Sequence, residues 1–262
     1  LLHPEPRDVL VIGLASGVTL GAAGKHPLRR VRVLEIAPGV VEAARLFAAH
    51  NGDALADPRV EVVVDDARQS LMVSPETYDV ISSQPSNPWV AGVSNLFTLE
   101  FYRLARSRLR PGGLFCQWVQ AYRLDPEDMR GIVATFLRVF PQATLWEESA
   151  GGGDYFLVGG EAPPRIDPDR LRSAPAAAAW EDLARAGVDG PAALLSRFVT
   201  GPSGLASLSA GARLHTDDDL YLEWRTPLAL FRDSQRDLVT ALNRHREPVL
   251  SVLARGTSIV DA

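Results

Sequence analysis

The sequence predicts an α/β fold with a Rossmann-like, seven-stranded sheet that has helices on both faces, followed by a mostly helical extension. From residue 8 to about residue 160, short β-branched runs alternate with segments of helical periodicity, which is typical of a parallel sheet. After Gly160 the composition changes to a stretch rich in proline and alanine. We therefore expect an α/β domain over residues 1–160 and a helical extension over residues 161–262 that packs on it.

The expected strands and helices follow one another along the chain. Strands are expected at residues 8–13, 31–36, 60–64, 78–83, 113–119, 143–147 and 154–159. Helices are expected at about 18–25, 38–50, 66–72, 97–109, 125–139 and 234–255. In such a sheet the carboxyl ends of the parallel strands share one edge, and ligands bind there. Candidate site residues are therefore sought directly after each strand.

Composition and charge exclude several classes of protein. The chain has 262 residues, 46% of them hydrophobic and 23% charged, which is ordinary for a globular protein. A net charge of -5 argues against nucleic acid as a partner, because phosphate neutralisation needs clustered cations. The single cysteine, Cys116, cannot form an internal disulfide, and the sequence contains neither an apolar run of membrane-spanning length nor a signal peptide. We expect a cytoplasmic protein with no metal site.

A glycine-containing turn follows the first expected strand. Gly13, Ala15 and Gly17 lie between the apolar run 9–12 and the first helix, where backbone N–H groups can meet the polar groups of a ligand. The alternative is a tight turn that only lets the helix pack against the strand. A dinucleotide enzyme usually has a tighter G-x-G-x-x-G turn, so the sequence favours a sulfonium nucleoside such as S-adenosylmethionine.

Acidic residues follow the next two strands. Glu35 lies 18 residues beyond Gly17, where a carboxylate can accept hydrogen bonds from both hydroxyl groups of a ribose. Asp65, Asp66 and Ala67 follow the third strand, within reach of an adenine amino group. Capping of the next helix is the alternative role for Asp66, and the role of Asp65 stays open. The sequence thus favours Glu35 as the ribose ligand and Asp66 as the adenine ligand.

Several runs of the sequence, taken in order, resemble the spermidine synthase family of polyamine aminopropyltransferases. They are the runs at 9–17, 33–36, 57–60, 65–67, 78–81, 95–102 and 109–113. The resemblance covers about residues 5–141. The runs at 85–89, 117–119 and 216–218 resemble a bacterial subgroup in which such a domain follows a membrane region.

The resemblance implies a methyltransferase-type sheet and a role in polyamine biosynthesis. The nucleoside substrate would be decarboxylated S-adenosylmethionine or S-adenosylmethionine, the partner a small amine acceptor, and no metal would take part. It assigns Gly13 and Gly17 to the nucleoside turn, Glu35 to the ribose and Asp66 to the adenine. It also implies a homodimer and a full-length protein at the cytoplasmic face of the membrane.

The sequence departs from the family at the residues that act on the amine. The family pattern Asp-Ser-Ser-Asp-Pro supplies a general base, whereas this chain has Gln84 and Asn87 at the two acidic positions. A carboxylate about 4 Å from an ammonium contributes on the order of 4 kcal/mol at an effective dielectric constant near 20. Substitutes for the missing carboxylates are sought among the acids Asp65, Glu100, Asp217 and Asp218. The alternative for residues 217–219 is a solvated acidic turn.

Aromatic and amide side chains are expected at the same edge of the sheet. Trp89, Gln117, Trp118 and Tyr122 fall on loops or strand ends there. Aromatic rings can stack on adenine or attract a sulfonium through cation–π contact, although packing is the alternative role for each of them.

Three functions remain open from the sequence. The first is aminopropyl transfer to an amine. The second is another reaction of S-adenosylmethionine, either methyl transfer or an intramolecular displacement that releases methylthioadenosine. The third is a non-catalytic module that senses a nucleoside.

Overall fold

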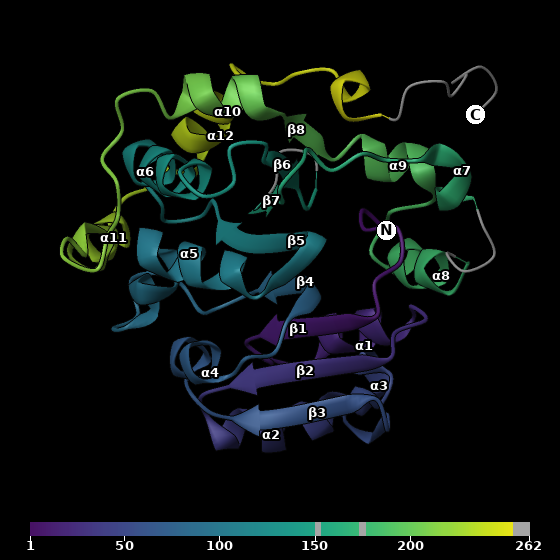
Figure 1. Ribbon diagram of the computed structural model, residues 1–262. Coiled ribbons are helices and arrows are strands. Elements are labelled where there is room, and N and C mark those ends of the chain that lie inside the picture. Colours follow the sequence, from purple (N-terminus) through teal and green to yellow (C-terminus); the bar gives the residue numbers. More distant parts are fainter. Residues whose placement is uncertain (150–152, 173–176, 254–262) are drawn as a thin grey trace.

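A computed structural model describes residues 1–149, 153–172 and 177–253, and within these ranges eight strands form one sheet (Figure 1). The predicted Rossmann-like class and all seven predicted strands are confirmed, and an eighth strand extends the sheet. The strands are β1 (Asp8–Ile12), β2 (Arg30–Glu35), β3 (Val60–Val64), β4 (Tyr78–Ser83), β5 (Leu109–Gln120), β6 (Thr144–Glu147), β7 (Asp154–Gly159) and β8 (Phe198–Thr200).

The strand order is β3-β2-β1-β4-β5-β7-β6-β8. The first five strands in this order are parallel, whereas β7 is antiparallel to β5 and β6, and β8 is antiparallel to β6. The carboxyl ends of the parallel strands therefore lie along one edge, at the left in Figure 1. From β1 the chain adds β2 and β3 on one side, and then returns to add β4 and β5 on the other side of β1. A crevice is expected between β1 and β4, where this change of side occurs.

Helices cover both faces of the sheet because the apolar residues of each central strand alternate in direction. Leu10 and Ile12 of β1 pack with the helices of one face, and Val9 and Val11 pack with those of the other. The helices of the first half are α1 (Val18–Gly24), α2 (Pro38–Ala44), α3 (Ala48–Asn51), α4 (Ala67–Val73), α5 (Leu99–Ser107) and α6 (Pro126–Leu137), with short 3-10 turns at η1 (Arg45–Phe47), η2 (Ala54–Ala56) and η3 (Val93–Phe97). These helices lie close to the expected ranges. Among the strands, β5 begins at Leu109 rather than at the expected residue 113.

The C-terminal part contains mostly helices and also contributes β8 to the sheet. Its helices are α7 (Pro168–Leu171), α8 (Ala177–Arg185), α9 (Pro191–Leu195), α10 (Pro202–Leu208), α11 (Tyr221–Ala229) and α12 (Gln235–Asn243), followed by the 3-10 turn η5 (Val249–Val252). The helix expected at 234–255 was too long: α12 ends at Asn243, and residues 254 and 255 lie outside the described residues. Pro248, which has no backbone N–H to donate, precedes η5. Among the helices of the described ranges, none has the length and apolar character needed to cross a bilayer.

A buried carboxylate belongs to an ion-pair network at the amino ends of four neighbouring strands, β2, β1, β4 and β5. The Asp8 side chain at the start of β1 is fully buried and accepts hydrogen bonds from Arg29, at 2.9 Å, and from Arg110. Asp79 of β4 pairs with the same Arg110 at 3.1 Å. The guanidinium of Arg29, followed by that of Arg110, lowers the pKa of Asp8 although burial opposes the shift.

Replacement of Asp8 by Asn should therefore lower the free energy of unfolding at neutral pH by about 1–3 kcal/mol, the usual range for hydrogen bonds to charged groups. Because the pKa of Asp8 is lowered from 3.8 in the folded state, this contribution is complete above that value and is lost as the pH falls toward the folded pKa. Urea unfolding of both proteins at neutral and acidic pH measures the difference. Curves that stay equally far apart at both pH values would contradict the assignment.

Candidate functional site

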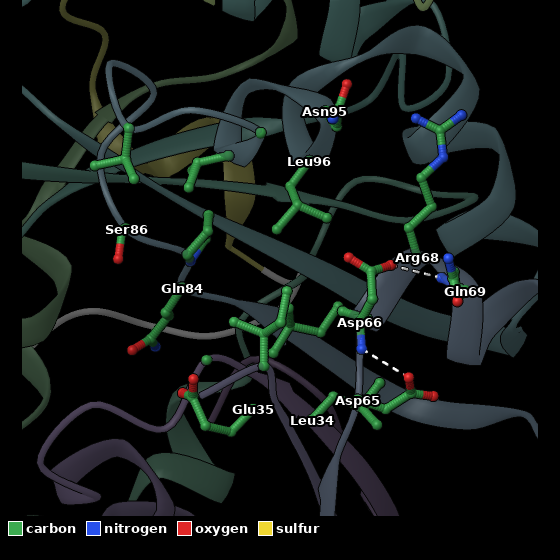
Figure 2. A pocket seen from close by; sticks show the side chains of 18 of the residues that line it. Leu34, Glu35, Asp65, Asp66, Arg68, Gln69, Gln84, Ser86, Asn95 and Leu96 are labelled. Carbon is green, nitrogen blue, oxygen red and sulfur yellow. Dashed lines mark hydrogen bonds between the residues drawn. The ribbon is translucent and has the colours of Figure 1, made fainter. Parts of the chain in front are cut away.

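A cavity of about 950 Å³ opens at the carboxyl ends of the parallel strands. Its wall includes Gly13 after β1, Glu35 at the end of β2, Asp66 after β3 and Gln84 after β4. Figure 2 shows Glu35, Gln84 and Ser86 at one side of the cavity and Asp65, Asp66 and Arg68 at the other, with Leu96 and Asn95 between them at the top of the view. A cavity of this size can hold a ligand as large as a nucleoside with an extended substituent.

Gly13 allows two strand ends to come together at this cavity. Its φ is +87°, and a Cβ at this position would lie 2.4 Å from the backbone oxygen of Gln84. The N–H of Gly13 donates to the carbonyl of Leu34 at 2.9 Å, and the N–H of Gln84 donates to the carbonyl of Ile12 at 2.9 Å. The turn therefore requires glycine for both conformation and space. Ala15, which also has a positive φ of 47°, lines the cavity.

Gly17 closes the same turn but does not line the cavity. It has a φ of +80° at the start of α1, and a Cβ there would lie 2.9 Å from the Nδ2 atom of Asn51. Asn51 is buried and donates hydrogen bonds to the carbonyls of Ser16, at 2.8 Å, and Ala44, at 2.9 Å. This amide thus fixes the loop from behind. No local pattern points to Asn51, because its partners lie 35 and 7 residues away along the chain.

The carboxylate of Glu35 is held by the backbone on both of its oxygens. Oε2 accepts a hydrogen bond from the N–H of Leu14 at 2.9 Å, and Oε1 accepts one from the N–H of Ala37 at 2.9 Å. The residue is 8% exposed and lines the cavity. Since a carboxylate oxygen can accept two hydrogen bonds, each oxygen keeps capacity for one more donor. The arrangement can receive two adjacent hydroxyl groups.

The two aspartates after β3 differ in how many of their oxygens are engaged. Asp65 accepts from the N–H of Asp66 with Oδ1, at 2.8 Å, and from the hydroxyl of Ser70 with Oδ2, at 2.5 Å. Asp66 caps α4 by accepting from the N–H of Gln69 with Oδ1, at 2.8 Å. Both residues and Ala67 line the cavity. Because the cap uses one oxygen of Asp66, the capping role and a ligand contact through the other oxygen are compatible.

Gln84 and Asn87 lie close in sequence but have different surroundings. Gln84 lines the cavity, where its Oε1 accepts from the hydroxyl of Thr19 at 2.7 Å and its Nε2 donates to Ser82 at 3.1 Å. Asn87 does not line the cavity and donates from Nδ2 to the hydroxyl of Tyr122 at 2.9 Å. Of the two, Gln84 is the one in position to touch a ligand of the cavity.

Of the aromatic and amide candidates, too, some line the cavity and others do not. Trp118 lines the cavity, whereas Gln117 on the same strand points elsewhere, is fully buried and donates to the carbonyl of Trp118 at 3.0 Å. Trp89 and Tyr122 form an edge-to-face pair with ring centroids 6.1 Å apart. Tyr122 lines a second, smaller hollow of about 400 Å³.

Arg68 is a charged cavity residue that the sequence reasoning did not single out. It lies in the first turn of α4 and forms an ion pair with Asp217, with 2.8 Å between Nη1 and Oδ1. This guanidinium lowers the pKa of Asp217. The N–H of Asp217 also donates to Glu100 at 2.9 Å. Asp217 thus pairs with a residue of the cavity wall, but neither Asp217 nor Glu100 nor the exposed Asp218 lines the cavity itself.

Comparison with known proteins gives a consistent result. The profile of the spermine/spermidine synthase domain matches residues 1–146. Polyamine aminopropyltransferase 2 of Pseudomonas aeruginosa is 37% identical over 147 residues, which are 54% of this chain and 42% of that protein. The chain thus spans less than half the length of this curated relative.

Two crystal structures have the same fold over two thirds of the chain. The spermidine synthase from Thermotoga maritima superposes with a TM-score of 0.57 and 26% identity, covering 66% of this chain and 60% of the other. A spermidine synthase in complex with the transition state analogue AdoDATO superposes with a TM-score of 0.56 at the same identity, covering the same shares of the two chains.

Proposed function

This chain belongs to the spermine/spermidine synthase family, and from that premise we propose that it binds decarboxylated S-adenosylmethionine or S-adenosylmethionine and transfers an aminopropyl group to an amine. The carboxylate of Glu35, held by two backbone N–H groups beside the Gly13 turn, carries the proposal. It presents two acceptor oxygens to the cavity, as binding of a ribose diol requires. The family relative that was crystallised with a transition state analogue supports the choice of ligand.

The remaining contacts of the nucleoside follow from the same wall. The second oxygen of Asp66 would accept a hydrogen bond from the adenine amino group, while Ala67 and Ala15 would contact the base and the sugar. Gly13 and Gly17 would shape the turn beside the ribose. Trp118 would face the sulfonium end, where an indole ring attracts a cation. Asn87, Trp89, Gln117 and Tyr122 would support the loops around the acceptor.

Gln84 would contribute to the reaction by helping to position the reactants rather than by accepting a proton. A primary amide does not accept a proton at neutral pH, and both ends of this one are hydrogen-bonded to Thr19 and Ser82. The rate would then come mostly from alignment of the nitrogen with the carbon beside the sulfonium. The attacking nitrogen must arrive without its extra proton.

One assay tests this function against its alternatives. The chain is incubated with each of the two nucleosides, with and without putrescine or spermidine, and the nucleoside products are separated by chromatography. Methylthioadenosine that forms only with an amine supports aminopropyl transfer. S-adenosylhomocysteine indicates methyl transfer, methylthioadenosine without an amine indicates intramolecular displacement, and binding without product indicates a sensing module.

Replacement of Glu35 by Ala should weaken binding of methylthioadenosine by about 1–3 kcal/mol, or roughly 5- to 150-fold in Kd, because the ribose hydroxyls lose their partners. Isothermal titration calorimetry measures the change. Glu42 is an exposed carboxylate on α2 that does not line the cavity, so Glu42→Ala makes the same charge change as a control. Equal affinities of the two variants would remove Glu35 from the site.

The resemblance also implies features that this chain does not test. Homodimer formation and a membrane region in the full-length protein stay predictions, as does the domain division at residue 160, which rests on the change of composition there. Light scattering after size-exclusion chromatography tests the first of them.

A further inference from the structure

The charged residues of the cavity all belong to the ends of β2 and β3 or to the start of α4. Within the described part of the chain, the charged side chains that line it are Glu35, Asp65, Asp66 and Arg68. They follow β2 and β3 or begin α4, and in Figure 2 Asp65, Asp66 and Arg68 lie on the opposite side of the view from Ser86, whereas Glu35 lies beside Gln84. Each has a partner in the protein. The nucleoside side of the cavity is therefore polar and electrostatically organised.

The remaining wall is built from uncharged side chains. After β4 it comprises residues 84–86, 90–93, 95 and 96, and β5 adds Trp118. Its polar side chains are the amides of Gln84 and Asn95 and the hydroxyl of Ser86, and apolar residues such as Val93 and Leu96 lie between them. None of these groups carries a charge at neutral pH. Acceptors that enter beside the sulfonium would contact this wall.

The amide of Gln84 carries no charge that could balance a cation here, although its oxygen keeps one lone pair for a further donor. Its oxygen is already the acceptor of the Thr19 hydroxyl, and its nitrogen is a donor to Ser82. An alkylammonium in contact with this wall would lose water and gain only neutral dipoles, which disfavours the charged form. A neutral amine with an apolar body loses far less hydration free energy on entering the cavity, and Leu96 and Trp118 can contact that body.

Resting on the function proposed above, we propose that the acceptor is a weakly basic amine, uncharged at neutral pH and carried on an apolar body, rather than a polyamine cation. Its nitrogen lone pair attacks the propyl carbon bonded to the sulfonium. The new N–C bond forms as the C–S bond breaks, and the electron pair of that bond goes to sulfur to give neutral methylthioadenosine. The positively charged nitrogen of the product then releases a proton to water, so the protein needs no general base.

Three acceptor amines test the effect of the amine's charge separately from the effect of its shape. Aniline is uncharged at neutral pH, benzylamine has a similar apolar ring but is an ammonium, and putrescine is a flexible dication. With decarboxylated S-adenosylmethionine and the 262-residue chain, we expect methylthioadenosine to form fastest with aniline and slowest with putrescine, with at least about a tenfold difference between the two. Mass spectrometry of the aminopropylated amine confirms the transfer.

A pair of variants tests the wall itself. Ser86 lines the cavity and is exposed, so Ser86→Asp adds a carboxylate there and Ser86→Asn adds a side chain of the same shape without charge. We expect only Ser86→Asp to shift the preference toward putrescine.

Several outcomes would overturn the inference. They are a wild-type preference for putrescine, no product from any of the amines, or equal behaviour of the two Ser86 variants. Calorimetry with methylthioadenosine distinguishes the level of failure. If the nucleoside binds while the amine order is wrong, only the acceptor assignment fails, whereas absence of nucleoside binding overturns the proposed function as well.

Discussion

Replacement of Gly13 by Ala is expected to lower the free energy of unfolding by about 2–5 kcal/mol and to weaken nucleoside binding. The left-handed conformation of this residue, with a φ of +87°, costs an alanine roughly 1–2 kcal/mol. In addition, the new Cβ would lie 2.4 Å from the carbonyl oxygen of Gln84, and relief of such an overlap costs about 1–3 kcal/mol. Because the new Cβ would overlap a backbone oxygen, which cannot rotate away as a side chain can, the ends of β1 and β4 must separate at the cavity. Denaturant unfolding and calorimetry measure the two effects.

Gly39 offers the matched control for this substitution. It lies in the first turn of α2, its φ is not in the left-handed region, and a Cβ there would have nothing within 4 Å. We expect Gly39→Ala to leave stability unchanged or to raise it by about 0.4–1 kcal/mol, since alanine restricts the unfolded chain. If Gly13→Ala behaved like Gly39→Ala, the tight approach of the two strand ends would be refuted.

The parts of the fold that sequence reasoning could predict are those specified by local patterns. The alternation of strand and helix periods predicted β1 to β7 within a few residues, and Glu35 could be placed because it ends a strand. In contrast, the ion pair between Arg68 and Asp217 joins residues 149 positions apart, so no local pattern points to it. Strand β8 has only three residues, and its pairing with β6 is likewise non-local.

Some of the differences had a signal that was overlooked. Pro248 interrupts the range 234–255 and argues against one continuous helix, and the described chain ends α12 at Asn243. The run 84–88 illustrates a different limit. Gln84 and Asn87 occupy one motif, yet the chain turns after β4, so that Gln84 lines the cavity and Asn87 bonds to Tyr122. Spacing in a loop does not determine direction, whereas spacing in a strand does.

Replacement of Gln84 by Asp is expected to raise putrescine-dependent formation of methylthioadenosine by about 10²–10⁴-fold, the usual contribution of a positioned general base. The new carboxylate would attract the ammonium at the uncharged wall and accept its proton before attack. Gln84 lines the cavity and is anchored by Thr19 and Ser82, so a shorter carboxylate remains at the same strand end. Initial rates with decarboxylated S-adenosylmethionine and putrescine measure the gain.

Two variants separate the chemistry of this carboxylate from its side effects. Gln84→Asn shortens the side chain equally without adding charge, so it should not raise the rate. Gln69→Asp adds a charge to the same cavity on the side away from Gln84. A rate increase confined to Gln84→Asp would mean that the position of the negative charge, rather than its presence in the cavity, limits the reaction of a cationic amine. A flat or reduced rate in Gln84→Asp would instead show that residue 84 does not face the attacking nitrogen.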